Sequence, residues 1–175
     1  MRLVHGTAAS EQDAGRGRDR TQARVKHMPL YFAYGSNLDV PQMQQRCAEH
    51  VRVVAPGCLR GYALAFTAYS SSWAGGVADV VLAPQQEVWG LVYDLSIEAL
   101  LHLDIYEGYP HLYTRFQGAI AVPQGVLSDV WIYAVVNKQA FISPSEVYLR
   151  VLQRAARCFD FPEAYRAFLD SIATR

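Results

Sequence analysis

The carboxyl group of Glu107 is the first candidate for acid–base chemistry in this sequence. It follows a segment, Ser96 to Tyr106, whose apolar residues recur at helical spacing, so we expect it at the C-terminus of a helix that Gly108 ends. The negative end of a helix dipole and burial among apolar neighbours both disfavour a carboxylate and raise its pKa. A carboxyl with a raised pKa suits general acid–base catalysis. A solvent-exposed glutamate at a helix end is the more common alternative.

A competing carboxylate, Asp104, lies about one turn earlier on the same helix, and we interpret it as structural. Ser96 is the predicted cap of this helix. The residues predicted to form its buried stripe are Ile97, Leu100, Leu101 and Ile105.

A second candidate for chemistry is the turn formed by Tyr34, Gly35, Ser36 and Asn37. The preceding apolar segment, Leu30 to Ala33, predicts a buried strand, and a helix is predicted over residues 41–49. A strand that breaks before a helix exposes backbone amides, which can bind a carboxylate, a phosphate or an oxyanion. An ordinary turn without a ligand is the alternative, because so short a pattern is a weak signal.

The remaining pattern predicts several strands followed by two helices. Strands are expected over residues 51–60, 62–68, 77–82, 87–95, 113–122 and 128–136. The first of these is expected to be bent or at an edge because of Pro56 and Gly57, and a turn at Pro84 is expected to separate residues 77–82 from 87–95. Helices are expected near residues 145–159 and 162–173. Strands without regular alternation with helices indicate an α+β fold.

Several blocks of this sequence resemble the γ-glutamylcyclotransferase family, and they occur in the family's order. The blocks are YFAYGSNL at 31–38, EVWGLVY at 87–93, LDIYEGYP at 103–110, YTR at 113–115 and SPSEVY at 143–148. The resemblance implies a compact, mixed, mostly antiparallel and curved β-barrel with flanking helices, and a cyclotransferase pocket.

The resemblance also implies roles for particular residues. Glu107 falls on the position of the family's catalytic glutamate, and the substrate-binding positions are Tyr31, Tyr34, Gly35, Ser36, Asn37 and Tyr148. Core packing is the alternative for Tyr31 and Tyr34, and an interface or core position is the alternative for Tyr148. Arg115 is a candidate partner for a substrate carboxylate, with a surface arginine as the alternative. Trp73 and the serines beside it are candidates for the leaving-group side of the pocket.

The activity implied is an intramolecular attack by the α-amine of a γ-glutamyl compound on its γ-carbonyl, which yields 5-oxoproline and a free amine or amino acid. Glu107 would act as general base and then general acid, and the reaction needs no metal or other cofactor. Two alternatives stay open: an enzyme that removes the γ-glutamyl group from a different amine, and a non-catalytic protein that binds a small γ-glutamyl or carboxylate ligand.

The composition favours one domain that binds a small molecule. The chain has 175 residues, of which 51% are hydrophobic, and its 16 basic residues equal its 16 acidic ones. This balance argues against a nucleic-acid or membrane partner. The three cysteines, Cys47, Cys58 and Cys158, have no paired spacing, which indicates reduced thiols and a cytoplasmic protein. The histidines lack metal-ligand spacing. The oligomeric state stays open.

Residues 1–27 differ in composition from the rest of the chain. They contain six basic and three acidic residues and no apolar run of signal-peptide length. We expect a flexible N-terminal extension over 1–27 and a γ-glutamylcyclotransferase-like domain over 28–175. Met28 directly precedes the first strand and is a candidate start of the natural chain.

Overall fold

The protein is described here by a computed structural model, which covers residues 28–47 and 50–175. The strands are β1 (Leu30–Ala33), β2 (Val51–Ser70), β3 (Gly75–Leu95), β4 (Tyr113–Val122) and β5 (Gly125–Val135). They close into a barrel in the order β1–β3–β2–β4–β5. All pairs are antiparallel except β1 and β5, which close the barrel in parallel. The mixed, mostly antiparallel barrel expected from the sequence is confirmed.

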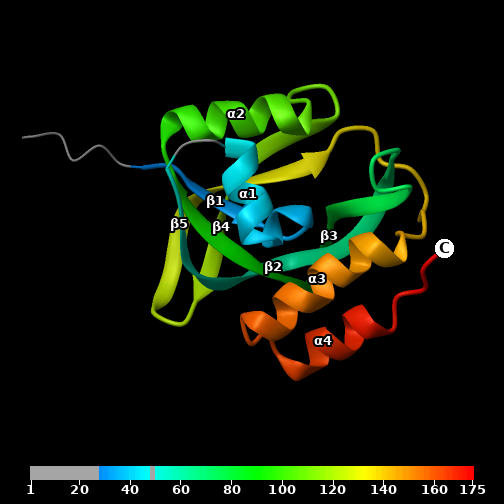
Figure 1. Cartoon of the computed structure of the whole chain (residues 1–175). Coiled ribbons are helices and arrows are strands. Elements are labelled where there is room, and N and C mark those ends of the chain that lie inside the picture. The colour runs from blue at the N-terminus through cyan, green and yellow to red at the C-terminus, as the bar shows by residue number, and fades with distance from the viewer. Residues whose placement is uncertain (1–27, 48–49) are drawn as a thin grey trace, which may run out of the picture.

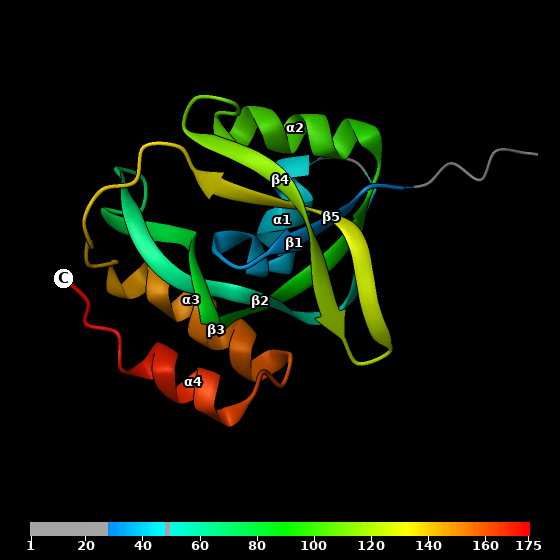
Figure 2. The same ribbon diagram turned by 180° about the vertical axis from the view of Figure 1, so that it is seen from behind.

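The helices are η1 (Ser36–Leu38, a 3₁₀ turn), α1 (Val40–Cys47), α2 (Ile97–Glu107), α3 (Glu146–Cys158) and α4 (Glu163–Asp170). Figure 1 shows α2 across one side of the barrel, the pair α3 and α4 across the opposite side, and α1 between them. Figure 2 shows the long β4–β5 hairpin from behind. The α+β class is confirmed, because the helices flank the barrel instead of alternating with its strands.

The two strands predicted over residues 51–60 and 62–68 form one strand, β2. The register along β3 shifts between Arg60 and Tyr62, and Gly61 at this bulge has a φ angle of 82°. Glycine adopts such a left-handed conformation without steric cost, so the strand continues through a residue that the sequence pattern marks as a break. A further bulge between Val53 and Ala55 bends the strand.

The turn predicted at Pro84 is also wrong, because residues 75–95 form the single strand β3. The ladder with β2 passes from Leu82 directly to Glu87, so Pro84 lies in a step outside the paired register. A proline lacks the N–H group that a paired position would need, and an irregular step of this kind tolerates it.

Helix α2 has the predicted ends but a different buried face. Ser96 accepts a hydrogen bond from the Ala99 backbone at 3.0 Å, and Gly108 ends the helix. Three of the four residues predicted to be buried are exposed, namely Ile97, Leu101 and Ile105, at 47%, 53% and 79%. The buried residues are Ala99, Leu100, Leu103 and Asp104. Apolar residues occur on all sides of this helix, so the sequence does not mark one face.

A buried carboxylate, Asp79 of β3, connects three parts of the barrel. Its side chain accepts hydrogen bonds from Thr67 of β2 at 2.6 Å, from the Val135 backbone of β5 at 2.9 Å and from Lys138 Nζ at 2.5 Å. The Val80 backbone donates at 2.8 Å. Four donors, one of them the cation of Lys138, compensate for the removal of this charge from water.

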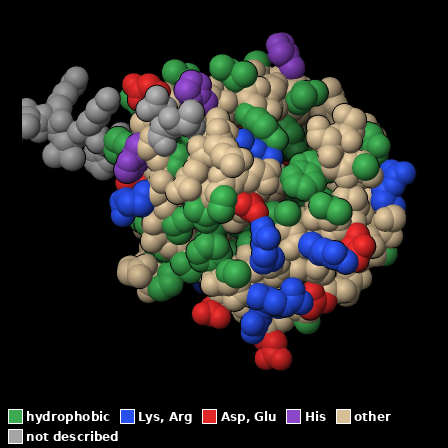
Figure 3. Space-filling model, viewed as in Figure 1, with side chains coloured by type: hydrophobic (Ala, Val, Ile, Leu, Met, Phe, Trp, Pro, Cys, Tyr) green, Lys and Arg blue, Asp and Glu red, His purple; other side chains and the backbone are tan. Residues whose placement is uncertain are grey.

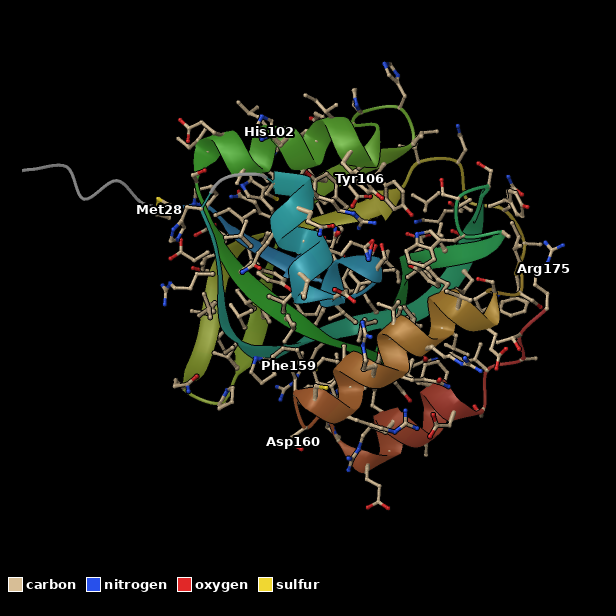
Figure 4. The ribbon with its side chains drawn as sticks, viewed as in Figure 1. Met28, His102, Tyr106, Phe159, Asp160 and Arg175 are labelled. Atoms are coloured by element: carbon tan, nitrogen blue, oxygen red, sulfur yellow. The ribbon has the colours of Figure 1, made fainter. Side chains whose placement is uncertain are left out.

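The described chain begins at Met28 and ends at Arg175, on opposite sides of the molecule (Figure 4). The expected extension over residues 1–27, and residues 48–49 of the helix predicted over 41–49, lie outside the described residues. No helix within 28–47 and 50–175 is long and apolar enough to cross a membrane.

Candidate active site

A cavity of about 600 Å³ lies between the turn after β1, the end of α2 and the start of α3. Its walls also include the β2–β3 turn and parts of β4 and β5. The structure brings all seven sequence-predicted site residues to this cavity, namely Tyr31, Tyr34, Gly35, Ser36, Asn37, Glu107 and Tyr148. Segments far apart in the sequence therefore meet at one site.

Glu107 is the last residue of α2 and faces the turn after β1. Its Oε1 atom accepts a hydrogen bond of 2.9 Å from Nδ2 of Asn37, and the same amide donates to the Tyr31 hydroxyl at 2.9 Å. Burial raises the pKa of the Glu107 carboxyl, while the Asn37 hydrogen bond and the charge of Arg46 lower it. The net shift is upward, the direction expected from the sequence.

Arg46, on α1, is a residue that the sequence analysis missed. It donates hydrogen bonds to Ser36 Oγ at 3.0 Å and to the side-chain oxygen of Asn37. Its guanidinium carbon lies 3.9 Å from the ring centre of Tyr106, in the last turn of α2 (Figure 4). The one signal in the sequence is a cation on a helix directly after the turn, a pattern that surface arginines share.

Tyr148 explains why residue 35 is a glycine. The Tyr148 hydroxyl accepts a hydrogen bond of 3.0 Å from the Ala78 backbone amide of β3. A Cβ atom at position 35 would lie only 2.9 Å from this oxygen. The side chain of Ser145 caps α3 by accepting a hydrogen bond of 3.2 Å from the Tyr148 backbone, so the tyrosine occupies the first turn of that helix.

The three tyrosines predicted for the site line the cavity and also belong to the core, namely Tyr31, Tyr34 and Tyr148. A place in the site and a place in the core are therefore compatible. Tyr34 donates to the Tyr133 carbonyl at 2.6 Å and is 5% exposed. The Tyr93 hydroxyl donates to the Asn37 carbonyl at 2.9 Å, below the turn. Burial raises the pKa of Tyr31 and Tyr34, so both phenols are protonated at neutral pH.

Asp104 and Arg115 form a separate cluster that does not line the cavity. An Arg115 nitrogen lies 3.2 Å from Asp104 Oδ2, and the Tyr133 hydroxyl donates to Asp104 Oδ1 at 2.5 Å. The Arg115 guanidinium lies 4.5 Å from the Trp131 ring centre. The structure therefore pairs Arg115 with a carboxylate of the protein itself, and Asp104 connects α2 to β4 and β5.

The β2–β3 turn forms the opposite side of the cavity, with Trp73 and Ser70 to Ser72 among the lining residues. The Trp73 ring packs edge-on against Tyr148, with 5.1 Å between ring centres. The structure places these residues at the cavity, and their role on the leaving-group side stays a prediction.

The buried cysteines are poor candidates for nucleophiles. Burial raises the pKa of Cys47 to about 11 and that of Cys58 to about 12, so both are thiols at neutral pH. Within residues 28–47 and 50–175, no group of three His, Cys, Asp or Glu side chains is arranged to hold a metal ion.

Comparison with known proteins assigns the chain to a family. Residues 31–150 match the family described as gamma-glutamyl cyclotransferase, AIG2-like. The chain therefore belongs to the AIG2-like γ-glutamyl cyclotransferase family, and it is an enzyme of this class.

Individual relatives give the same assignment. The chain is 30% identical to the gamma-glutamylcyclotransferase of Bos taurus over 148 residues, which cover 82% of this chain and 78% of the bovine one. It is 28% identical to the gamma-glutamylcyclotransferase of Homo sapiens over 148 residues, which cover 82% of this chain and 78% of the human one. A solved structure of a gamma-glutamyl cyclotransferase superimposes with a TM-score of 0.78 at 27% identity, covering 84% of this chain and 89% of that one.

Proposed function

We propose that this protein converts a γ-glutamyl compound into 5-oxoproline and a free amine or amino acid, with Glu107 as the general acid and base. The observation that carries the proposal is the position of the Glu107 carboxyl, 2.9 Å from Asn37, in the cavity that the turn after β1 also lines. The cavity, at about 600 Å³, has the size of a small-molecule site.

The substrate supplies its own nucleophile, the α-amine, so the protein has to fold the substrate back and move protons. Holding the amine against the γ-carbonyl removes much of the entropic cost of the attack. The backbone amides near Gly35, Ser36 and Asn37 are the proposed partners of the substrate α-carboxylate and of the developing oxyanion. Tyr31, Tyr34 and Tyr148 are the proposed sides of this subsite.

The proton transfers balance on one carboxyl group. The Glu107 carboxylate takes a proton from the α-ammonium group, and the freed amine forms a bond to the γ-carbon. The protonated Glu107 then donates to the departing nitrogen as its bond to the γ-carbon breaks. A second proton, carried by the attacking nitrogen after it has bonded to the γ-carbon, passes through Glu107 to the leaving nitrogen in the same way, and the amine departs as an ammonium ion. In total the attacking nitrogen loses two protons, the leaving amine gains two, and Glu107 returns to the carboxylate. The raised pKa of Glu107 supports both steps, because it brings the carboxyl closer to the operating pH.

Incubation with a panel of γ-glutamyl dipeptides and γ-glutamyl amines, followed by an assay for 5-oxoproline, tests the proposal and identifies the leaving group. We expect turnover of at least one member and equal amounts of 5-oxoproline and released amine. Binding without turnover across the panel, measured by calorimetry, would instead support the non-catalytic alternative.

A further inference from the structure

Arg46 lies outside the cavity but contacts three residues that line it, namely Ser36, Asn37 and Tyr106. One of its nitrogens donates to Ser36 Oγ at 3.0 Å and to the Oδ1 atom of Asn37. The other terminal nitrogen donates to the side chain of Gln42, and the guanidinium group stacks over the ring of Tyr106. Three hydrogen bonds and one aromatic face hold this planar group in a single position.

The contact with Arg46 determines which way the Asn37 amide points. An asparagine amide has an acceptor side and a donor side, whereas a guanidinium group only donates. The Oδ1 atom of Asn37 must therefore face Arg46, and its NH₂ group must face the other way. The two N–H bonds of that group are directed at the Tyr31 hydroxyl and at Glu107 Oε1, each at 2.9 Å.

The orientation of this amide favours the carboxylate form of Glu107. If the amide turned over, its oxygen would face the carboxyl, and a hydrogen bond would then require a protonated Glu107. A protonated Glu107 cannot take a proton from the substrate amine. With the amide held as observed, the hydrogen bond from Asn37 is stronger to the carboxylate and lowers the pKa of Glu107, and the positive charge of Arg46 lowers it further.

Other ionisable groups face Glu107 from the surrounding elements. Tyrosines approach from β1, β4, β5 and α3, namely Tyr31, Tyr113, Tyr133 and Tyr148, and burial keeps them protonated at neutral pH by raising their pKa. Cys47 of α1 is likewise protonated. His111 lines the same cavity, so the test includes it.

We propose that Arg46 is a positioning residue for this reaction: by holding the oxygen of Asn37, it fixes the amide that donates to Glu107 and keeps the Glu107 carboxylate oriented and ready to accept a proton. The inference rests on the proposed role of Glu107. Arg46 acts through Asn37, and no contact between Arg46 and the substrate is required.

The test replaces Arg46 by methionine, which keeps the apolar stem over Tyr106 and removes the charge and the donors. We expect the acid limb of the kcat/KM profile to move to higher pH by about one unit. Below that limb, kcat/KM then falls about tenfold, because a base must be unprotonated to act and one pH unit is a factor of ten in its fraction. Activity recovers as the pH is raised. Carbon-13 NMR titration of the Glu107 carboxyl measures the same shift without turnover.

Two variants complete the experiment. Arg154→Met removes an arginine that pairs with Asp39, close to the same turn but outside the cavity, and we expect no movement of the acid limb. Arg46→Lys keeps the charge and a donor group, so we expect its acid limb to lie close to that of the wild type. Repeating the Arg46→Met profile with His111→Gln present identifies any part of the shift that belongs to the histidine.

The results separate this inference from the proposed function. An unchanged acid limb and an unchanged Glu107 titration in Arg46→Met would overturn the inference, even if Glu107→Gln is inactive. If the wild-type protein forms no 5-oxoproline, the proposed function fails, and the NMR titration still decides whether Arg46 controls Glu107. If Arg46→Met does not fold, the same two measurements on Arg46→Gln decide, because this variant removes the charge with a shorter polar side chain: an unchanged acid limb and an unchanged Glu107 titration would contradict the proposal.

Discussion

At Glu107, opposing influences act on one carboxyl group. Burial favours the protonated form, and the Asn37 amide and the Arg46 charge favour the carboxylate. A group that must accept and then return a proton benefits from a pKa that such opposing influences adjust. The carboxyl group one turn away, in Asp104, lies in a different environment, with an arginine and a tyrosine as partners.

The two carboxylates should respond differently to neutralisation. Glu107→Gln keeps the hydrogen bond to Asn37 but cannot accept a proton, so we expect kcat/KM to fall by about 10²–10⁴-fold with substrate binding largely kept. Asp104→Asn leaves Arg115 without its ionic partner, so we expect a lower melting temperature and less than about a tenfold loss of rate. Steady-state kinetics with calorimetric binding would check both. The reverse ranking of rates would assign the base to Asp104.

The raised pKa of Glu107 also makes the free energy of unfolding depend on pH. Between the ordinary value of 4.5 and the higher folded-state pKa, the folded protein binds more protons than the unfolded chain, so this residue lowers stability as the pH rises through that window. We therefore expect Glu107→Gln to gain in free energy of unfolding relative to wild type between about pH 4 and pH 7. Urea unfolding of the wild type and of Glu107→Gln at about pH 4 and about pH 7 measures how their free energies of unfolding differ. A difference between the two proteins that does not change with pH would contradict this expectation.

The sequence predicted Glu107 and the turn after β1 as site candidates. It did not predict Arg46, which contacts Asn37 in that turn. Tyr31, Asn37 and Glu107 occur in blocks that resemble a known family, and the structure brings them to one cavity. Arg46 has no such block, and its position depends on how α1 packs against α2. A contact between two helices is a tertiary property, so local spacing carried no signal for it.

Among the elements, the ends of α2 were predictable and its buried face was not. Local chemistry sets the ends, since Ser96 satisfies a free amide and Gly108 ends the helix. Packing sets the face, and a helix that is apolar on all sides can present more than one stripe to the barrel. The long strands β2 and β3 were divided for a similar reason, because Gly61 and Pro84 mark irregular steps of a continuous ladder.

The carboxylate of Asp79 connects elements that form one end of the barrel. Asp79→Ala leaves the Val135 amide and the Thr67 hydroxyl without their acceptor and Lys138 without its partner. We expect a loss of about 3 kcal/mol in free energy of unfolding. Asp170→Ala is a matched control, because Asp170 is 46% exposed in its pair with Arg157 on the α3–α4 face, and the expected loss is below about 1 kcal/mol. Figure 3 shows the mixed charges of that face. Equal losses in urea unfolding would contradict the assignment.

For the molecule as a whole, every lining residue of the cavity lies between Tyr31 and Tyr148. We therefore expect a chain that begins at Met28 to keep both its melting temperature and its rate of 5-oxoproline formation. A chain that ends at Cys158 lacks the buried residues Phe161, Tyr165 and Leu169, and we expect it to melt several degrees lower because three core side chains are lost. A drop of several degrees in the chain that begins at Met28 would show that the first 27 residues stabilise the domain.

The hydroxyl of Tyr148 lies next to Gly35. Helix α3, which comes much later in the sequence, therefore forms one side of the turn after β1. During synthesis the ribosome releases the turn early and α3 late. A nascent chain that lacks α3 has no partner for the Ala78 amide and an open side to the cavity. We therefore expect a chain that stops before Tyr148 to form no 5-oxoproline, because one side of the cavity is missing.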